Sequence, residues 1–157
     1  MPSCIIIRGA AGVGKTTIAK ELARITKSDY YSVDDVLEQN GLDTIIGDGI
    51  PADNFIKADD IILKNLNDEK TAVIDGCFYR EEQLKHMKEN CKKLHIFTLH
   101  ANLPECKRRN ARRSEPLPSD AVEQVYKLVY NIREGVIITT MNKTIRQIIK
   151  EILSYQD

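Results

Sequence analysis

The stretch Gly9-Ala10-Ala11-Gly12-Val13-Gly14-Lys15-Thr16 decides how this chain folds. It follows Cys4-Ile5-Ile6-Ile7, an apolar run typical of a strand that is buried on both faces. Apolar residues recur after it at helical spacing, at Ile18, Leu22 and Ile25. The glycines permit positive φ angles and a close approach of the backbone to a neighbour. The sequence therefore predicts a strand, a tight glycine-rich loop and an amphipathic helix, in that order.

These eight residues fit the pattern G-x-x-x-x-G-K-[ST] of a P-loop, or Walker A motif. Successive amide N–H groups of such a loop point inward at an anion, with the N-terminus of a helix behind them. We expect Lys15 to reach the β and γ phosphates of ATP, and Thr16 to offer its hydroxyl to Mg²⁺. A plain glycine turn with a solvated Lys15 is disfavoured, because the loop joins an apolar strand to an amphipathic helix. The expected nucleotide-binding residues in this segment are Gly9, Ala10, Ala11, Gly12, Val13, Gly14, Lys15, Thr16 and Thr17.

Strands and helices alternate along the rest of the chain. Further strands are predicted at residues 29–33, 71–75, 94–99 and 135–140, each followed by a segment with helical spacing. This alternation predicts a parallel sheet that is covered by helices on both faces, a three-layer α/β fold. With 157 residues, the chain has the length of a single domain, over residues 1–157.

Composition excludes several classes of protein. The chain has 23 basic and 23 acidic residues, and this balance disfavours a protein that mainly coats duplex nucleic acid. No apolar run approaches the ~20 residues that span a bilayer, and the start lacks the basic region of a secretory signal. The four cysteines show neither C-x-x-C nor metal-finger spacing, so we expect reduced thiols. Together these features predict a cytoplasmic protein with no membrane partner.

Asp34 and Asp35 end the second predicted strand, where α/β sheets place contacts with substrates. Phosphoryl transfer needs a carboxylate near the acceptor hydroxyl, and we expect Asp34 to be the catalytic base or orienting group. The alternative is an N-cap for a helix that starts near Val36. Both can hold if Asp34 is the chemical group and Asp35 is the cap.

Asp75 ends the strand Thr71-Ala72-Val73-Ile74-Asp75, which has the form of a Walker B motif. In that role its carboxylate holds Mg²⁺, directly or through water. The alternative is an ordinary aspartate in a turn with Gly76. Because a P-loop lies upstream, the sequence favours the metal interpretation, with Thr16 and Asp75 as the metal residues.

Residues 107–113 put five cations into seven positions. Such a run is usually a solvated face, but Arg109 and Arg113 are four residues apart and share one side of a helix. We expect these two to clamp the transferred phosphoryl group, within a lid over residues 103–118. Arg108 and Arg112 form the neighbouring pair and are expected to face solvent.

The predicted function is that of an ATP- and Mg²⁺-dependent phosphotransferase that moves the γ-phosphoryl group to a hydroxyl acceptor. A guanine-specific switch is disfavoured, because Asn142-Lys143-Thr144-Ile145 lacks the aspartate of N-K-x-D. Two alternatives stay open, a nucleoside monophosphate kinase and a sensor that binds ATP without transferring phosphate.

The sequence also resembles the P-loop kinases that include zeta-type toxins, chloramphenicol phosphotransferases and the 5′-kinase domain of phage polynucleotide kinases. The resemblance rests on the P-loop, on Val33-Asp34-Asp35, on Val73-Ile74-Asp75 and on residues 108–113 with the helix after them. It implies a five-stranded sheet of order 2-3-1-4-5, Asp34 as base, Asp75 as a metal-side acid and Arg109 and Arg113 as lid arginines. It also implies that the loop Thr140-Met141-Asn142-Lys143 lies near the adenine, with Asn142 as a nucleotide contact.

The sequence departs from polynucleotide kinases on the acceptor side. Those enzymes tend to show D-D-x-R after the second strand and D-T-N after the third. This chain has Asp34-Asp35-Val36-Leu37 and Asp75-Gly76-Cys77 instead. The acceptor pocket is expected over residues 34–66, and its ligand is left open between a small metabolite and a 5′-hydroxyl nucleic-acid end.

Overall fold

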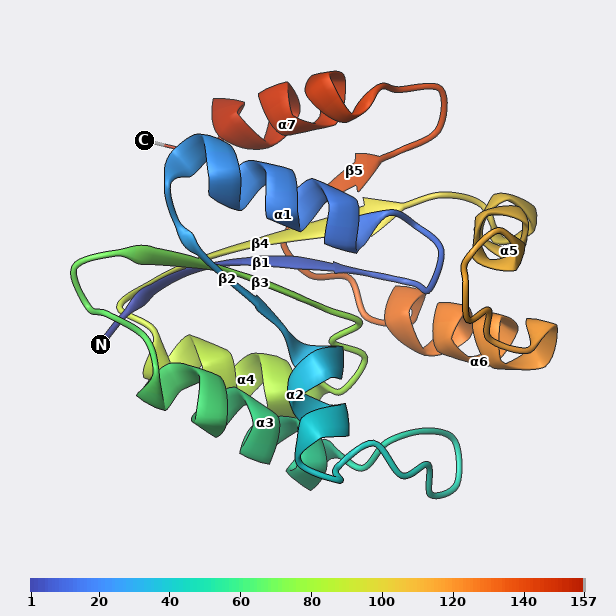
Figure 1. Ribbon diagram of the computed structural model, residues 1–157, viewed down its shortest axis with the longest axis horizontal. Helices are drawn as coiled ribbons and strands as arrows, with labels where there is room; N and C mark the ends of the chain where they lie inside the picture. Colours follow the sequence, from blue (N-terminus) through green and yellow to red (C-terminus); the bar gives the residue numbers. More distant parts are fainter. Residues whose placement is uncertain (157) are drawn as a thin grey trace.

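A five-stranded parallel sheet forms the centre of the protein, with β1 (Ser3–Gly9) as its middle strand (Figure 1). The computed structural model describes residues 1–156. The strand order is β2-β3-β1-β4-β5, which confirms the predicted order. The other strands are β2 (Asp29–Ser32), β3 (Thr71–Gly76), β4 (Lys93–His100) and β5 (Val136–Thr139). The carboxyl ends of these parallel strands therefore meet at one edge of the sheet.

Helices cover both faces of the sheet, which confirms the three-layer architecture (Figure 1). The helices α1 and α7 lie on one face, α2, α3 and α4 lie on the other, and α5 and α6 lie at the end where the P-loop turns. Their bounds are α1 (Lys15–Thr26), α2 (Val33–Gln39), α3 (Ala52–Lys64), α4 (Glu81–Asn90), α5 (Leu103–Ala111), α6 (Ser119–Tyr130) and α7 (Ile145–Ser154). No helix within residues 1–156 is long and apolar enough to cross a membrane.

Alternation along β1 divides the apolar core into two halves. Ile5 and Ile7 belong to the cluster formed with α1 and α7, whereas Cys4 and Ile6 belong to the cluster formed with α3 and α4. Successive side chains of a strand point to opposite faces, so a continuous apolar run is what a strand between two layers requires. The core thus fixes the position of Gly9, where the P-loop begins.

The start of α2 differs from the prediction. The second strand ends at Ser32 and the helix begins at Val33, rather than near Val36. Ser32 is the N-cap, because its hydroxyl accepts a hydrogen bond from the Asp35 backbone N at 3.2 Å. The N-cap alternative for the aspartates was therefore wrong. Asp34 and Asp35 lie in the first turn, where their charge is stabilised by the helix dipole.

A buried carboxyl in α3 forms part of the core beneath the sheet. The side chain of Asp59 is fully buried, and Gln83 Nε2 of α4 donates to its Oδ1 at 3.2 Å. Asp59 Oδ2 and Gln83 Oε1 are both buried without a hydrogen-bond partner among residues 1–156. Burial raises the pKa of Asp59 well above its usual range. A proton on Asp59 supplies the missing donor, so we infer that Asp59 is neutral in the folded protein.

The protonation of Asp59 predicts an unusual response to pH. Because its pKa is raised on folding, the stability that Asp59 contributes is complete below about pH 4 and falls as the pH rises through the folded-state pKa. The amide of Asp59→Asn is a hydrogen-bond donor that does not have to take up a proton. We therefore expect the unfolding free energy of the variant to exceed that of wild type by at least ~1 kcal/mol at pH 8, with a smaller difference at pH 5. Urea unfolding at both pH values measures this. Asp53→Asn, at an exposed position of the same helix, is the control. A destabilised Asp59→Asn at pH 8 contradicts the neutral carboxyl.

Candidate active site

The P-loop joins β1 to α1 and is shaped by its glycines. Gly12 and Gly14 have φ angles of 82° and 100°, which side-chain-bearing residues rarely adopt. A Cβ atom on Gly12 would lie 2.3 Å from the Cys106 carbonyl oxygen of α5. The first turn of α1 holds no acidic residue, and Gly14, its N-cap, provides no side-chain hydrogen bond. The positive end of α1 is therefore available to an anion.

Gly12→Ala tests how closely α5 is packed on the P-loop. We expect the variant to lose about 2 kcal/mol of unfolding free energy, because the methyl group adds a backbone clash to the strain of a positive φ. Gly41→Ala is the matched control, since Gly41 also has a positive φ (65°) but has open space around its Cβ position. Chemical denaturation of both variants separates the clash from the strain. Equal losses would contradict a tight contact with α5.

Lys15 lies beneath the loop and is only 8% exposed. Its Nζ donates to the Ala10 carbonyl oxygen at 3.4 Å. Burial lowers the pKa of Lys15, but the neighbouring Cys77, Asp34 and Asp75 raise it, and the net pKa lies above the usual value for lysine. Lys15 therefore stays protonated at neutral pH, as a cation that binds phosphates must.

Asp75 lies beside the P-loop at the end of β3 and is 1% exposed. Its carboxylate accepts hydrogen bonds from the Thr16 hydroxyl and from the Tyr30 hydroxyl. Burial raises the pKa of Asp75, whereas these hydrogen bonds and the charge of Lys15 lower it. A threonine hydroxyl and a carboxylate are ligands that Mg²⁺ accepts, and Mg²⁺ keeps several water or phosphate ligands. The two residues fit a magnesium site that a nucleotide completes.

The structure brings Asp34 to the same place. Its charge raises the pKa values of Lys15, Asp75 and Tyr79, so Asp34 lies near these three groups. Asp35 acts on Tyr30 instead. Asp34 is exposed, unlike the buried Asp75, and is therefore accessible to a second substrate.

The two lid arginines differ in their contacts. Arg109 donates to the Val13 carbonyl oxygen at 3.0 Å and to Thr140 Oγ1 at 2.9 Å, and it pairs with Glu105 at 2.9 Å. Arg109 thus ties the P-loop to the loop that carries Asn142. Arg113 is exposed, and its charge lowers the pKa of Lys15, so Arg113 lies near Lys15. Of the two arginines, Arg113 is the one whose side chain has no hydrogen-bond or ion-pair partner within residues 1–156.

Other contacts of the lid settle its local structure. Asn110 exchanges two hydrogen bonds with the Leu117 backbone, at 2.8 and 3.1 Å, which closes the loop between α5 and α6. Arg108 pairs with Glu105 and is exposed, as predicted. Arg112 is also exposed.

A buried arginine before the P-loop is the main residue that the sequence analysis missed. Arg8 is fully buried and makes five hydrogen bonds. They reach the carbonyl oxygens of Phe78, Val129 and Ile132 and the hydroxyl of Thr98. Arg8 thus joins β1 to β4, to the end of α6 and to the loop after β3. The one signal in the sequence is a charge at the end of an otherwise apolar strand.

Two tyrosines were also missed. Tyr130 of α6 accepts a hydrogen bond from the Ala10 backbone N at 3.2 Å and donates to the Leu99 carbonyl oxygen at 2.6 Å, so it supports the P-loop from below. Tyr30 orients the carboxylate of Asp75. Neither tyrosine belongs to a motif, because both act through contacts between distant elements.

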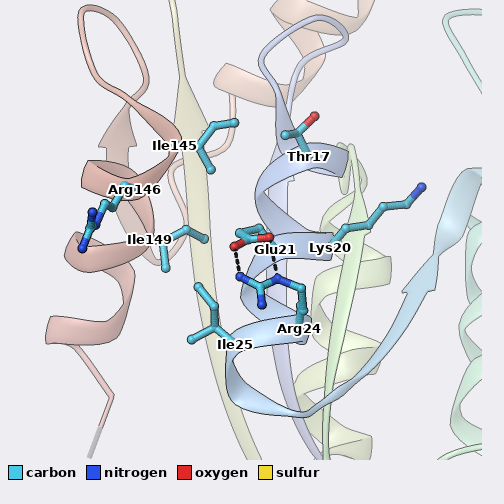
Figure 2. Close-up of a pocket in the computed structure, with 8 residues that line it drawn as sticks. All are labelled: Thr17, Lys20, Glu21, Arg24, Ile25, Ile145, Arg146 and Ile149. Atoms are coloured by element: carbon cyan, nitrogen blue, oxygen red, sulfur yellow. Dashed lines mark hydrogen bonds and ion pairs between the residues drawn. The ribbon is translucent and has the colours of Figure 1, made fainter.

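A groove of about 750 Å³ runs between α1 and α7 (Figure 2). An ion pair between Glu21 and Arg24 lies on its α1 side, and Ile145 and Ile149 face it from α7. Thr17, a predicted nucleotide contact, is exposed at the upper end of the groove. The residues that line it are Thr17, Lys20, Glu21, Arg24, Ile25, Ile145, Arg146 and Ile149. None of the residues predicted to act chemically lines this groove.

Comparisons with known proteins agree with this arrangement. No curated protein matches the sequence. A sugar kinase from Janibacter sp. HTCC2649 is similar in structure, with a TM-score of 0.79 and 16% identity over 99% of this chain and 94% of that chain. A gluconokinase from Sinorhizobium meliloti 1021 has a TM-score of 0.73 and 15% identity, over 98% and 90% of the two chains. Shikimate kinase from Aquifex aeolicus has a TM-score of 0.67 and 18% identity, over 96% and 94%.

At these identities the similarity concerns the fold, that of P-loop NTPases. The model of the AAA domain family matches residues 5–133, which include most of β1, the P-loop, Asp34, Asp75 and the lid. The chain therefore belongs to the AAA domain family and has the P-loop NTPase fold.

Proposed function

We propose that the protein is an ATP- and Mg²⁺-dependent phosphotransferase that moves the γ-phosphoryl group of ATP to a hydroxyl acceptor. The observation that carries the proposal is the meeting of three charged groups below the P-loop. Lys15 is a protonated cation for phosphates, Asp75 with Thr16 fits a metal, and Asp34 is a separate, exposed carboxylate. Binding a nucleotide needs the first two features, whereas transfer to an acceptor also needs the third.

In the proposed reaction, the acceptor oxygen forms a bond to the γ-phosphorus as the bond to the β–γ bridging oxygen breaks. Asp34 orients the acceptor hydroxyl and takes its proton, and ADP leaves. Mg²⁺, when bound by Thr16 and Asp75, neutralises charge on the β and γ oxygens. The P-loop amides and Lys15 would bind the same phosphate oxygens.

The lid completes the proposed site. Arg113 covers the charge that develops on the transferred group. Arg109, bonded to Val13 and Thr140, fixes the loop that carries Asn142 against the P-loop, and we assign Asn142 and Thr17 to the nucleoside side. This arrangement agrees with similar folds in proteins that are named as small-molecule kinases.

The test is transfer of γ-labelled phosphate from Mg·ATP to a panel of acceptors. The panel holds sugar derivatives, nucleosides, nucleoside monophosphates and 5′-hydroxyl RNA and DNA oligomers. Label on a sugar or nucleoside supports a small-molecule kinase, and label on a monophosphate or an oligomer end assigns one of the other acceptor classes. Binding of ATP without labelling of any acceptor would instead indicate a nucleotide sensor.

A further inference from the structure

The two sides of the proposed site carry opposite charge. Residues 34–56, from α2 into α3, contain six acidic residues and no lysine, arginine or histidine. Residues 107–113 of the lid contain five cations, of which Lys107, Arg108 and Arg109 pair with glutamates, whereas Arg112 and Arg113 have no ion-pair partner among residues 1–156. Fields of exposed charges extend over roughly 8–10 Å at physiological salt. The lid side therefore suits a nucleotide triphosphate, whereas the side of Asp34 repels a second anion.

Arg80, in the loop after β3, is the cation that contacts this acidic segment. Its guanidinium is paired with a carboxylate of the segment. Its Nη2 donates to Asp48 Oδ1 at 2.7 Å, its Nε donates to the Ile50 carbonyl oxygen at 3.0 Å, and its guanidinium lies 5.0 Å from the centre of the Tyr79 ring. The Arg80 side chain is only 19% exposed. Arg80 also lowers the pKa of Asp48, so this carboxylate stays ionised and paired. An acceptor carboxylate or phosphate would have to displace Asp48 to use this cation.

The pairing of Arg80 belongs to a wider contact, which we name the Asp48–Arg80 latch: Asp48, Ile50, Tyr79 and Arg80. The Tyr79 hydroxyl accepts a hydrogen bond from the Ile50 backbone N at 2.8 Å. Gly49 is buried between them, and a Cβ atom there would lie 2.7 Å from the Tyr79 hydroxyl oxygen. The latch therefore holds the segment before α3 against the loop after β3 through backbone and side-chain contacts together.

We infer that the phosphate acceptor is a hydroxyl compound without negative charge, such as a neutral polyol or an amino sugar, and that the Asp48–Arg80 latch determines this specificity. The inference rests on the proposed function and names its substrate class. An anionic acceptor is repelled by the acidic segment, and Arg80 does not offset this repulsion because it is paired with Asp48. A protonated amine is attracted by the same negative charges.

A labelling experiment with separated charge classes tests the inference. A deproteinised yeast metabolite extract is split by ion exchange into anionic, neutral and cationic fractions, and each is incubated with the protein and γ-labelled Mg·ATP. We expect at least ~10-fold more labelled ester from the neutral and cationic fractions together than from the anionic fraction. Label mainly in the anionic fraction overturns the inference but leaves the proposed function intact. Label in no fraction overturns the proposed function itself.

A substitution then tests the role of the latch. Asp48→Asn leaves Arg80 without its carboxylate, so we expect the ratio of anionic to neutral labelling to rise about tenfold, with the KM for ATP unchanged. Asp43→Asn removes one charge from the same exposed loop without touching Arg80, and it is the matched control. Equal changes in both variants would overturn the assignment of specificity to the latch.

Discussion

We expect Asp34→Asn to lower the rate of phosphoryl transfer by about 10²–10⁴-fold, the usual range for loss of a general base. The affinity for Mg·ATP should change less than about threefold, because the phosphates are held by Lys15 and the P-loop amides. The amide is nearly isosteric but cannot take the proton of the acceptor hydroxyl. Single-turnover rates with saturating acceptor, together with equilibrium titration of ATP, separate the two effects.

Asp35→Asn is the matched control, since it removes the same charge from the same turn of α2. The charge of Asp35 affects the pKa of Tyr30, whereas that of Asp34 affects the pKa of Lys15, and we expect the transfer rate of Asp35→Asn to stay within about threefold of wild type. If Asp35→Asn were the more damaging change, the two aspartates would have to exchange roles. If neither change slowed transfer, a base at this position would be ruled out.

The second large effect concerns stability. We expect Arg8→Met to cost about 3–5 kcal/mol of unfolding free energy, because it removes five hydrogen bonds to oxygen atoms that are mostly buried. Methionine fills a similar volume but leaves the carbonyl oxygens of Phe78 and Val129 buried without these donors. Phe78 has a φ of 48°, and Arg8 holds its carbonyl in that conformation. Urea denaturation followed by circular dichroism measures the loss.

Arg133→Met removes an exposed arginine close to the end of α6 and should change stability by less than about 0.5 kcal/mol. A loss below about 1 kcal/mol for Arg8→Met would contradict its role as the joint between β1, β4 and α6. Because Arg8 lies directly before Gly9, loss of this joint should also weaken ATP binding in protein that remains folded.

The fold could be predicted because its elements are marked in the sequence by periodic apolar residues or by a known motif. The apolar run Cys4–Ile7 indicates a strand with two buried faces, and the glycine pattern indicates the turn to α1. Strands alternating with helices then leave few topologies. The order 2-3-1-4-5 came from the resemblance to P-loop kinases, and the observed sheet confirms it.

Only the site residues that belong to a sequence motif or end a predicted strand could be predicted from the sequence. Asp34 and Asp75 stand at the ends of predicted strands and Lys15 belongs to the P-loop motif, and the structure brings the three together. Arg8 and Tyr30 act through partners 45 to 124 positions away, which no local pattern encodes. The start of α2 was misplaced because Ser32, a good cap, ends the strand earlier than the hydrophobic pattern indicates.

The latch could not be predicted for a similar reason. Arg80 and Asp48 are 32 positions apart in loops that carry no periodic signal. Only the fold shows that the end of β3 and the segment before α3 meet. The excess of acidic residues in this part of the chain is visible in the sequence, but its effect on an acceptor depends on this contact.

We propose that the protein transfers phosphate to a hydroxyl group and does not merely bind ATP. The most direct test follows the label of γ-labelled Mg·ATP in a nucleotide-depleted metabolite extract and compares organic phosphate ester with inorganic phosphate. We predict that wild type forms labelled ester, and that Asp34→Asn binds ATP but forms almost none. If all released label is inorganic phosphate, in equal amounts from both proteins, transfer to an acceptor is contradicted.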